Sequence, residues 1–255
     1  MPPSPRTPLS PIFAAISELE EARSTWSHVE LQRAAMEEAA SRTRHLRINP
    51  QRIHPEEDHA HSRGSFGEVW RCWLEGETGE LERVAVKKLH LRPEDGRSNQ
   101  KLLRHLLREV VPWYELDHPN ITPFIGYIFD GRSARMLSKW QEGGNVNEYM
   151  RMQRSPANGL RIAYQVASGL AYLHSRNPPI VHGDIKPGNI LIGSDGVARL
   201  VDFGLSIILD DAVSRGLRTS NGCGHTLLYA DPVLLDDVPR TIETDLWALG
   251  WIIYE

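Results

Sequence analysis

Hydrophobic and polar positions divide the chain from residue 61 onward into a strand-rich part and a helical part. Leucines at helical spacing predict one helix in the first part, over residues 98–116, and an amphipathic helix over 159–176 opens the second part. Runs rich in β-branched and aromatic residues, bounded by turn residues, predict the strands. These cover residues 66–74, 83–90, 121–129 and 133–140. Strands first and helices later favour an α+β fold, with a small sheet unit followed by a helical unit.

The first 60 residues follow a different pattern, rich in proline and polar residues. Five prolines among residues 1–11 predict a disordered start, and apolar residues at loose helical intervals predict a helical segment within 12–45. We interpret this segment as a solvated or partner-docking helix. Pro50 and Pro55 in a polar stretch predict a linker over residues 46–60.

Composition narrows the class of protein. The 255 residues are 40% hydrophobic and 24% charged, which suits a globular protein with a substantial core. A net charge of -4 gives no reason to expect a nucleic acid or a membrane as partner. Two cysteines, Cys72 and Cys223, are too few for a disulfide framework and favour structural roles in a reducing compartment. Without a signal peptide or an apolar run of about 20 residues, a cytoplasmic or nuclear protein is predicted.

A glycine-rich segment, Arg63–Val69, begins the strand-rich part. Its glycines, Gly64 and Gly67, would let backbone amides approach phosphate groups closely. Taken alone, however, the segment is better explained as a plain hairpin turn.

A lysine, Lys87, ends the apolar run Val84–Lys87 on the following predicted strand. A lysine in such a place either extends to solvent at an edge or is held by a carboxylate. Glu109 in the next predicted helix is the candidate partner. Lys88 and Arg108 stand beside the two residues and could exchange roles with them.

The clearest candidate for a catalytic group is Asp184, which lies between His182 and Lys186. A carboxylate there can accept or orient a substrate hydroxyl, and the lysine can neutralise developing phosphate charge. Asn189 and Asp202 follow, and their side-chain oxygens are ligands of the kind that Mg²⁺ prefers. Each piece alone could be a capped turn or a chance tripeptide, but their joint order and spacing favour phosphoryl transfer.

In these motifs and their order, residues 61–255 resemble the protein kinase family. The resemblance implies a two-lobed fold, with a small antiparallel-sheet lobe and one helix over 61–138 and a helical lobe over 139–255. Residues 1–60 would then form an N-terminal extension. Since the chain stops at Glu255, the helical lobe is expected to lack its last helices.

The resemblance also assigns cofactors, ATP and Mg²⁺, and roles to single residues. Lys87 corresponds to the lysine that holds the α- and β-phosphates, with Glu109 as its partner. Asp184 corresponds to the catalytic aspartate, and Asn189 and Asp202 to the Mg²⁺ ligands. The other cofactor-binding positions are Ser62, Gly64, Ser65, Phe66 and Gly67 in the glycine-rich loop, Val69, Ala85 and Leu191 around adenine, and Ser138 and Trp140 in the hinge Met136–Gln141.

Two residues make the resemblance more specific, to kinases that modify serine and threonine. Lys186, two residues after the aspartate, is typical of that class, and Thr226 corresponds to a threonine that contacts the catalytic aspartate and lysine. The runs Pro187–Asn189 and Glu142–Val146 look closest to the tyrosine-kinase-like group.

Three positions depart from the family pattern. Ser62 replaces the first glycine of the loop, so weaker ATP binding is expected. Gly183 replaces an arginine that normally gathers a phosphate on the activation loop, so switching by loop phosphorylation is not expected. Val233 replaces a glutamate that forms an ion pair. The polar stretch Glu56–His61 is also a poor first strand, which predicts a weakened small lobe.

Three functions remain open at this point. The first is a kinase that transfers the γ-phosphate of ATP to serine or threonine of a protein substrate, favoured by the complete set of chemical residues. The second is a pseudokinase or truncated interaction module, favoured by Ser62, Val233 and the end at Glu255. The third is a small-molecule phosphotransferase of related fold, disfavoured by the long segment Leu205–Asp231 and by Thr226 within it.

Overall fold

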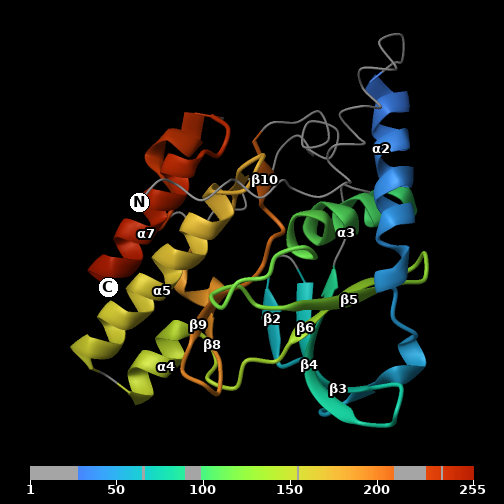
Figure 1. The fold of residues 1–255 in the computed structure, drawn as a ribbon, viewed down its shortest axis with the longest axis horizontal. Coiled ribbons are helices and arrows are strands. Elements are labelled where there is room, and N and C mark those ends of the chain that lie inside the picture. Colours follow the sequence, from blue (N-terminus) through green and yellow to red (C-terminus); the bar gives the residue numbers. More distant parts are fainter. Residues whose placement is uncertain (1–27, 65–66, 90–98, 154, 210–227, 237) are drawn as a thin grey trace. The chain divides into compact units, whose positions relative to one another are not determined.

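The computed structural model describes residues 28–64, 67–89, 99–153, 155–209, 228–236 and 238–255 (Figure 1). The described residues fall into two compact units. A sheet unit joins Ala39–Leu116 with Pro123–Trp140, and a helical unit contains the described residues among 28–38, 117–122 and 141–255. Several predicted positions lie outside the described residues, namely Ser65, Phe66, Cys223, Thr226 and the part of the predicted helical segment that precedes residue 28.

The sheet unit is built on one six-stranded antiparallel sheet and a helix. The strand order is β1-β3-β4-β6-β5, and β2 pairs with β3 as well. The strands are β1 Ile53–Pro55, β2 Ser62–Gly64, β3 Gly67–Glu75, β4 Leu81–Leu89, β5 Phe124–Phe129 and β6 Ala134–Lys139, and the helix is α3 Asn99–Trp113. The four strands and the helix predicted in this part of the chain are confirmed to within a few residues.

Side chains of β4 alternate between the two faces of the sheet, as the pleat requires. Val84 and Val86 are buried with Cys72 on one face. On the other face, Leu106 of α3 packs against Met136. Lys87 is the register partner of Met136 and therefore extends from the face that α3 covers. Burial raises the pKa of the Cys72 thiol to about 11, so this cysteine stays protonated and structural, as predicted.

The linker predicted over residues 46–60 is wrong, because its middle is a strand of the sheet. Ile53–Pro55 pairs with Cys72, Trp73 and Leu74 of β3. The polar residues that follow are partners of arginines on the neighbouring strands. Glu56 accepts two hydrogen bonds from Arg83, of 3.1 and 3.0 Å, and forms a 3.1 Å ion pair with Arg71. A strand of three residues is too short to give an alternating pattern, and its anchoring carboxylates resemble a solvated loop in sequence.

The helical unit contains longer helices and two small strand pairs. The helices are α4 Val146–Met152, α5 Pro156–His174 and α7 Ile242–Tyr254, and α2 His28–Arg42 precedes the sheet strands. The pairs are β7 Ile180–Val181 with β10 Ile207–Ile208, and β8 Ile190–Ile192 with β9 Ala198–Leu200. The amphipathic helix predicted over 159–176 is confirmed as α5, which buries Ile162, Val166 and Leu170. No helix in the described ranges has both the length and the apolarity that crossing a membrane requires.

Candidate active site

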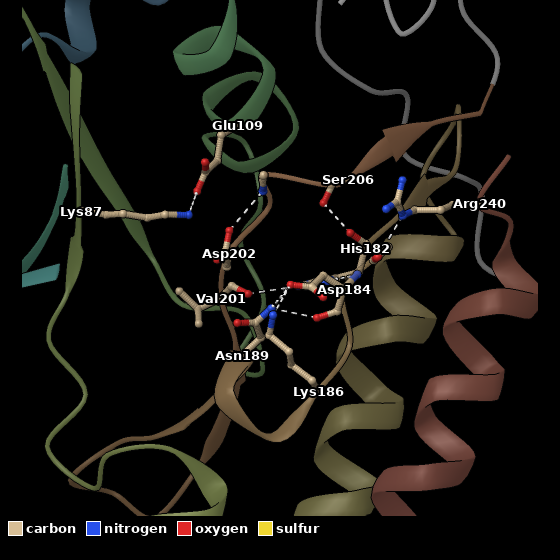
Figure 2. Close-up of polar contacts among 12 residues, drawn as sticks. Lys87, Glu109, His182, Asp184, Lys186, Asn189, Val201, Asp202, Ser206 and Arg240 are labelled. Carbon is tan, nitrogen blue, oxygen red and sulfur yellow. Dashed lines mark hydrogen bonds and ion pairs between the residues drawn. The ribbon is translucent and has the colours of Figure 1, made fainter. Parts of the chain in front are cut away.

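Within the sheet unit, the amine of Lys87 and the carboxylate of Glu109 form an ion pair (Figure 2). Nζ lies 2.7 Å from Oε1, and the Glu109 side chain is 4% exposed. The predicted pairing is therefore confirmed. Lys88 extends to the opposite face of β4 and is exposed, since successive side chains alternate. Burying two charges is costly unless they are paired, so the ion pair fixes the Lys87 amine on the α3 side of the sheet.

The two glycines of the glycine-rich segment lie where β2 ends and β3 begins. Gly64 and Gly67 are register partners, and Ser62 lies opposite Val69. Gly67 has φ +152°, and a Cβ atom there would overlap the carbonyl oxygen of Lys88 on β4. A side chain is therefore excluded at Gly67 by the sheet itself, whatever the segment binds.

Gly67→Ala is expected to lower the free energy of unfolding by about 1–3 kcal/mol, the usual cost of an overpacked atom. Gly250→Ala is the matched control. It lies on the exposed side of α7, and a Cβ there would meet no neighbour within 4 Å. That substitution is expected to stabilise by roughly 0.5–1 kcal/mol, because alanine favours helix. Urea unfolding of both variants checks the prediction, and an equal effect at the two positions would contradict it.

Two of the positions expected around the adenine ring, Val69 and Ala85, lie near Lys87 in the sheet, as does Ser138 of the expected hinge. Val69 is the register partner of Lys87, and Ala85 is the partner of the buried Ser138. Trp140, also of the expected hinge, contacts Arg83 and His61. Its backbone N–H donates to the carbonyl oxygen of Arg83 at 3.3 Å, and its ring packs edge-on against His61.

The last of the adenine positions, Leu191, lies on β8 of the helical unit, where it forms a bridge with Asn145.

In the helical unit, the carboxylate of Asp184 is held by two donors (Figure 2). Lys186 Nζ donates to Oδ2 at 2.7 Å, and Asn189 Nδ2 donates to the same oxygen at 2.8 Å. Asn189 Nδ2 also donates to the backbone carbonyl of Asp184 at 2.8 Å. The sequence predicted that these three residues act together, and the structure brings them together.

His182 fixes the backbone next to Asp184 through both ring nitrogens. Nε2 lies 3.1 Å from the carbonyl oxygen of Val201, and Nδ1 lies 3.3 Å from the backbone N of Asp184. A carbonyl only accepts and an amide N–H only donates, so this network assigns the neutral tautomer with the proton on Nε2. The ring also packs against Phe203, which is fully buried.

Asp202 is the residue after Val201, whose carbonyl contacts His182. The backbone N–H of Val201 donates to the carbonyl of Asn189 at 3.1 Å, which brings Asp202 beside Asn189. Among the residues that the structure describes, Asp202 is the only non-glycine with positive φ, at +70°. A side chain held in that region costs free energy and often marks a functional position. Gly204 N–H donates to its carboxylate at 3.3 Å.

The oxygen atoms of Asn189 and Asp202 suit a hard cation such as Mg²⁺. Within the described ranges, no group of three or more histidine, cysteine, aspartate or glutamate side chains could hold a metal ion by itself. Mg²⁺ usually takes one or two protein carboxylates together with water and substrate phosphates.

Sequence reasoning missed Asp245, the buried carboxylate that supports this loop. It is 1% exposed on α7. Oδ2 accepts from the backbone N–H of His182 and Oδ1 from that of Gly183, both at 2.8 Å. His174 Nε2 lies 2.9 Å from Oδ2. The available signal was an acidic residue beside a run of apolar residues, which demands internal partners if it is buried.

Comparison with known proteins agrees with these motifs. The family model of the protein kinase domain matches residues 60–255. Aurora kinase of Saccharomyces cerevisiae is 34% identical over 196 residues, which cover 76% of this chain and 50% of that protein. Serine/threonine-protein kinase CTR1 of Arabidopsis thaliana is 32% identical over 197 residues, covering 75% and 22%. Serine/threonine-protein kinase BCK1/SLK1/SSP31 of Saccharomyces cerevisiae is 33% identical over 199 residues, covering 76% and 13%. The chain spans half or less of the length of these relatives.

Proposed function

The chain belongs to the protein kinase family, and from that membership we propose that it transfers the γ-phosphate of ATP to serine and threonine hydroxyls of protein substrates. The observation that carries the proposal is the buried Asp184 carboxylate, held through one oxygen by Lys186 and Asn189. A carboxylate held in one orientation by its donors is placed to act as a general base.

In the proposed reaction, Asp184 orients the substrate hydroxyl and takes up its proton. The hydroxyl oxygen forms a bond to the γ-phosphorus, the bond from that phosphorus to the β,γ-bridging oxygen breaks, and ADP leaves with the electron pair. Both protein donors reach Oδ2 of Asp184. Oδ1 is therefore the oxygen we assign to the hydroxyl. We assign to the Lys186 ammonium, 2.7 Å from Asp184 Oδ2, the role of stabilising charge on the phosphate in transit.

Each unit carries residues that we propose for the nucleotide. We assign Lys87 to the α- and β-phosphates, since Glu109 keeps its charged amine in one place. Asn189 and Asp202 would bind Mg²⁺, which neutralises phosphate charge when bound. The remaining positions proposed for the nucleotide or the substrate are Ser62, Gly64, Ser65, Phe66, Gly67, Val69, Ala85, Ser138, Trp140, Leu191 and Thr226.

The organisation of the chain supports further proposals. We propose kinase lobes over 61–138 and 139–255, with β1 at Ile53–Pro55 extending the first lobe into the predicted N-terminal extension. Residues 12–45 are proposed to dock a partner. Two cysteines in 255 residues support a reducing compartment, the cytoplasm or the nucleus.

The experiment that tests the proposed function measures transfer of ³²P from Mg²⁺-[γ-³²P]ATP to dephosphorylated casein. Lys87→Met is expected to lower kcat/KM for ATP by about 10–100-fold, because a hydrogen bond to a charged group is worth about 1.5–3 kcal/mol. Lys88→Met, one residue away on the opposite face, is expected to change it less than twofold. Equal losses in the two variants would overturn the assignment of Lys87.

Removing Lys87 also leaves the Glu109 charge buried, so stability must be separated from chemistry. The double variant Lys87→Met, Glu109→Gln removes that charge. It is expected to regain the wild-type urea midpoint but not the transfer rate. Wild-type protein that binds Mg²⁺-ATP but transfers no phosphate would instead support a pseudokinase.

A further inference from the structure

Gly183, where the family pattern has an arginine, stands at a place that excludes any side chain. Its φ is +78°, a region that glycine adopts without strain. An added Cβ would lie 2.6 Å from Cδ of Arg240 and 2.7 Å from the carbonyl oxygen of Leu205. Leu205 presents backbone, which cannot turn aside. The surroundings therefore require glycine at this position, so its presence is not explained by loss of the arginine's function alone.

Arg240 uses the room that this glycine leaves. Its Nε donates to the carbonyl oxygen of Gly183 at 3.0 Å (Figure 2). That carbonyl belongs to the peptide group that joins Gly183 to Asp184. The N–H of the same peptide group donates to His182 Nδ1 at 3.3 Å. Arg240 and His182 thus hold the two ends of one peptide plane.

The peptide group on the other side of Gly183 is held as well, because its N–H donates to Asp245 at 2.8 Å. Glycine is the residue at which a backbone rotates most easily. The orientation of Asp184 therefore depends on contacts made from outside the loop. A guanidinium on the carbonyl also polarises the peptide and strengthens the hydrogen bond from its N–H.

We propose that Arg240 is a positioning residue of the active site, coupled to Gly183. The glycine makes room for the guanidinium, and the guanidinium fixes the peptide plane that carries Asp184. This inference rests on the proposed kinase function for its catalytic consequence, and on geometry alone for its effect on the loop.

A double-mutant cycle on the full chain tests the coupling, with the casein assay as the readout. Arg240→Ala is expected to lower kcat about tenfold, equivalent to about 1.4 kcal/mol, and to leave KM for ATP within twofold. Arg240→Lys should recover part of that loss. Gly183→Ala should lower kcat more than tenfold in the wild-type background. In the Arg240→Ala background, the fold loss caused by the same substitution should be at least threefold smaller. Arg151→Ala, at an exposed residue of α4, and Gly250→Ala are controls that should leave kcat unchanged.

Hydrogen exchange of the peptide spanning residues 182–189 separates this inference from the proposed function. Deuterium uptake there should be higher in Arg240→Ala than in the wild type. Uptake in α5 and the urea midpoint of the variant should equal the wild-type values. If the wild type transfers no phosphate, the kinase proposal fails and the exchange result still decides the role of Arg240. Unchanged exchange in Arg240→Ala, or losses that simply multiply in the cycle, would overturn the inference. So would a gain of activity when the family residue is restored in Gly183→Arg.

Discussion

Asp184→Asn is expected to lower the rate of phosphoryl transfer to protein by about 10²–10⁴-fold, the usual contribution of a positioned general base. Asparagine has nearly the same shape, but its amide cannot take up the substrate proton. It also places either an NH₂ group or a weaker acceptor opposite Lys186 and Asn189. The affinity for Mg²⁺-ATP should change little, because the nucleotide contacts proposed above involve other residues.

Asp117→Asn is the matched control for that loss. It makes the same chemical change on an exposed side chain of the same unit. Steady-state rates of the two variants, measured beside their urea midpoints, separate chemistry from folding. If Asp117→Asn lost as much activity as Asp184→Asn, or if Asp184→Asn kept the wild-type rate, Asp184 would not be the catalytic base.

Asp245→Ala is expected to lower the free energy of unfolding by about 2–6 kcal/mol. Two backbone N–H groups lose their acceptor, that of the buried His182 and that of the partly buried Gly183, and each loss costs about 1–3 kcal/mol. Domains are stable by only about 5–15 kcal/mol, so this single carboxylate is a large share. Activity should fall even under conditions where the variant is folded, because the backbone before Asp184 loses its support.

Glu243→Ala, two residues earlier on α7, provides the comparison. Glu243 is exposed, and hydrogen bonding to Thr241 holds its pKa below the usual range. Its removal should cost no more than an ordinary surface substitution. Urea unfolding measures both variants. An equal loss of stability at the two positions would show that Asp245 does not anchor the loop.

The strands and helices that have several residues in a clear period could be predicted from the sequence. β4 and α5 are examples, since each places apolar residues on one face at regular spacing. β1 could not, because three residues carry no period and Glu56, which follows it, has its partners on strands far along the chain. Nothing local distinguishes such a carboxylate from one in a solvated linker.

The candidate site also has a part that could be predicted from the sequence and a part that could not. The pairing of Lys87 with Glu109 and the grouping of Asp184, Lys186 and Asn189 follow from residue type and spacing, and their geometry is confirmed. Their chemical roles stay predictions.

The supporting contacts could not be read from the sequence. Asp245 and Arg240 reach the loop from residues more than fifty positions away, and their partners are backbone atoms, which leave no trace in side-chain type. From the sequence, Gly183 could be interpreted only as the loss of a phosphate-binding arginine, whereas the structure gives a steric reason for the glycine.

The most direct measurement is the amount of phosphoserine and phosphothreonine formed in casein by wild-type protein and by Asp184→Asn, with Mg²⁺-[γ-³²P]ATP as donor and acid hydrolysis of the product. Labelled phosphoserine and phosphothreonine should form with the wild type and fall by at least a hundredfold with Asp184→Asn, in line with the loss of a general base. Absence of label with folded wild-type protein, label on tyrosine alone, or equal label from the two proteins would contradict a serine/threonine kinase that works through Asp184.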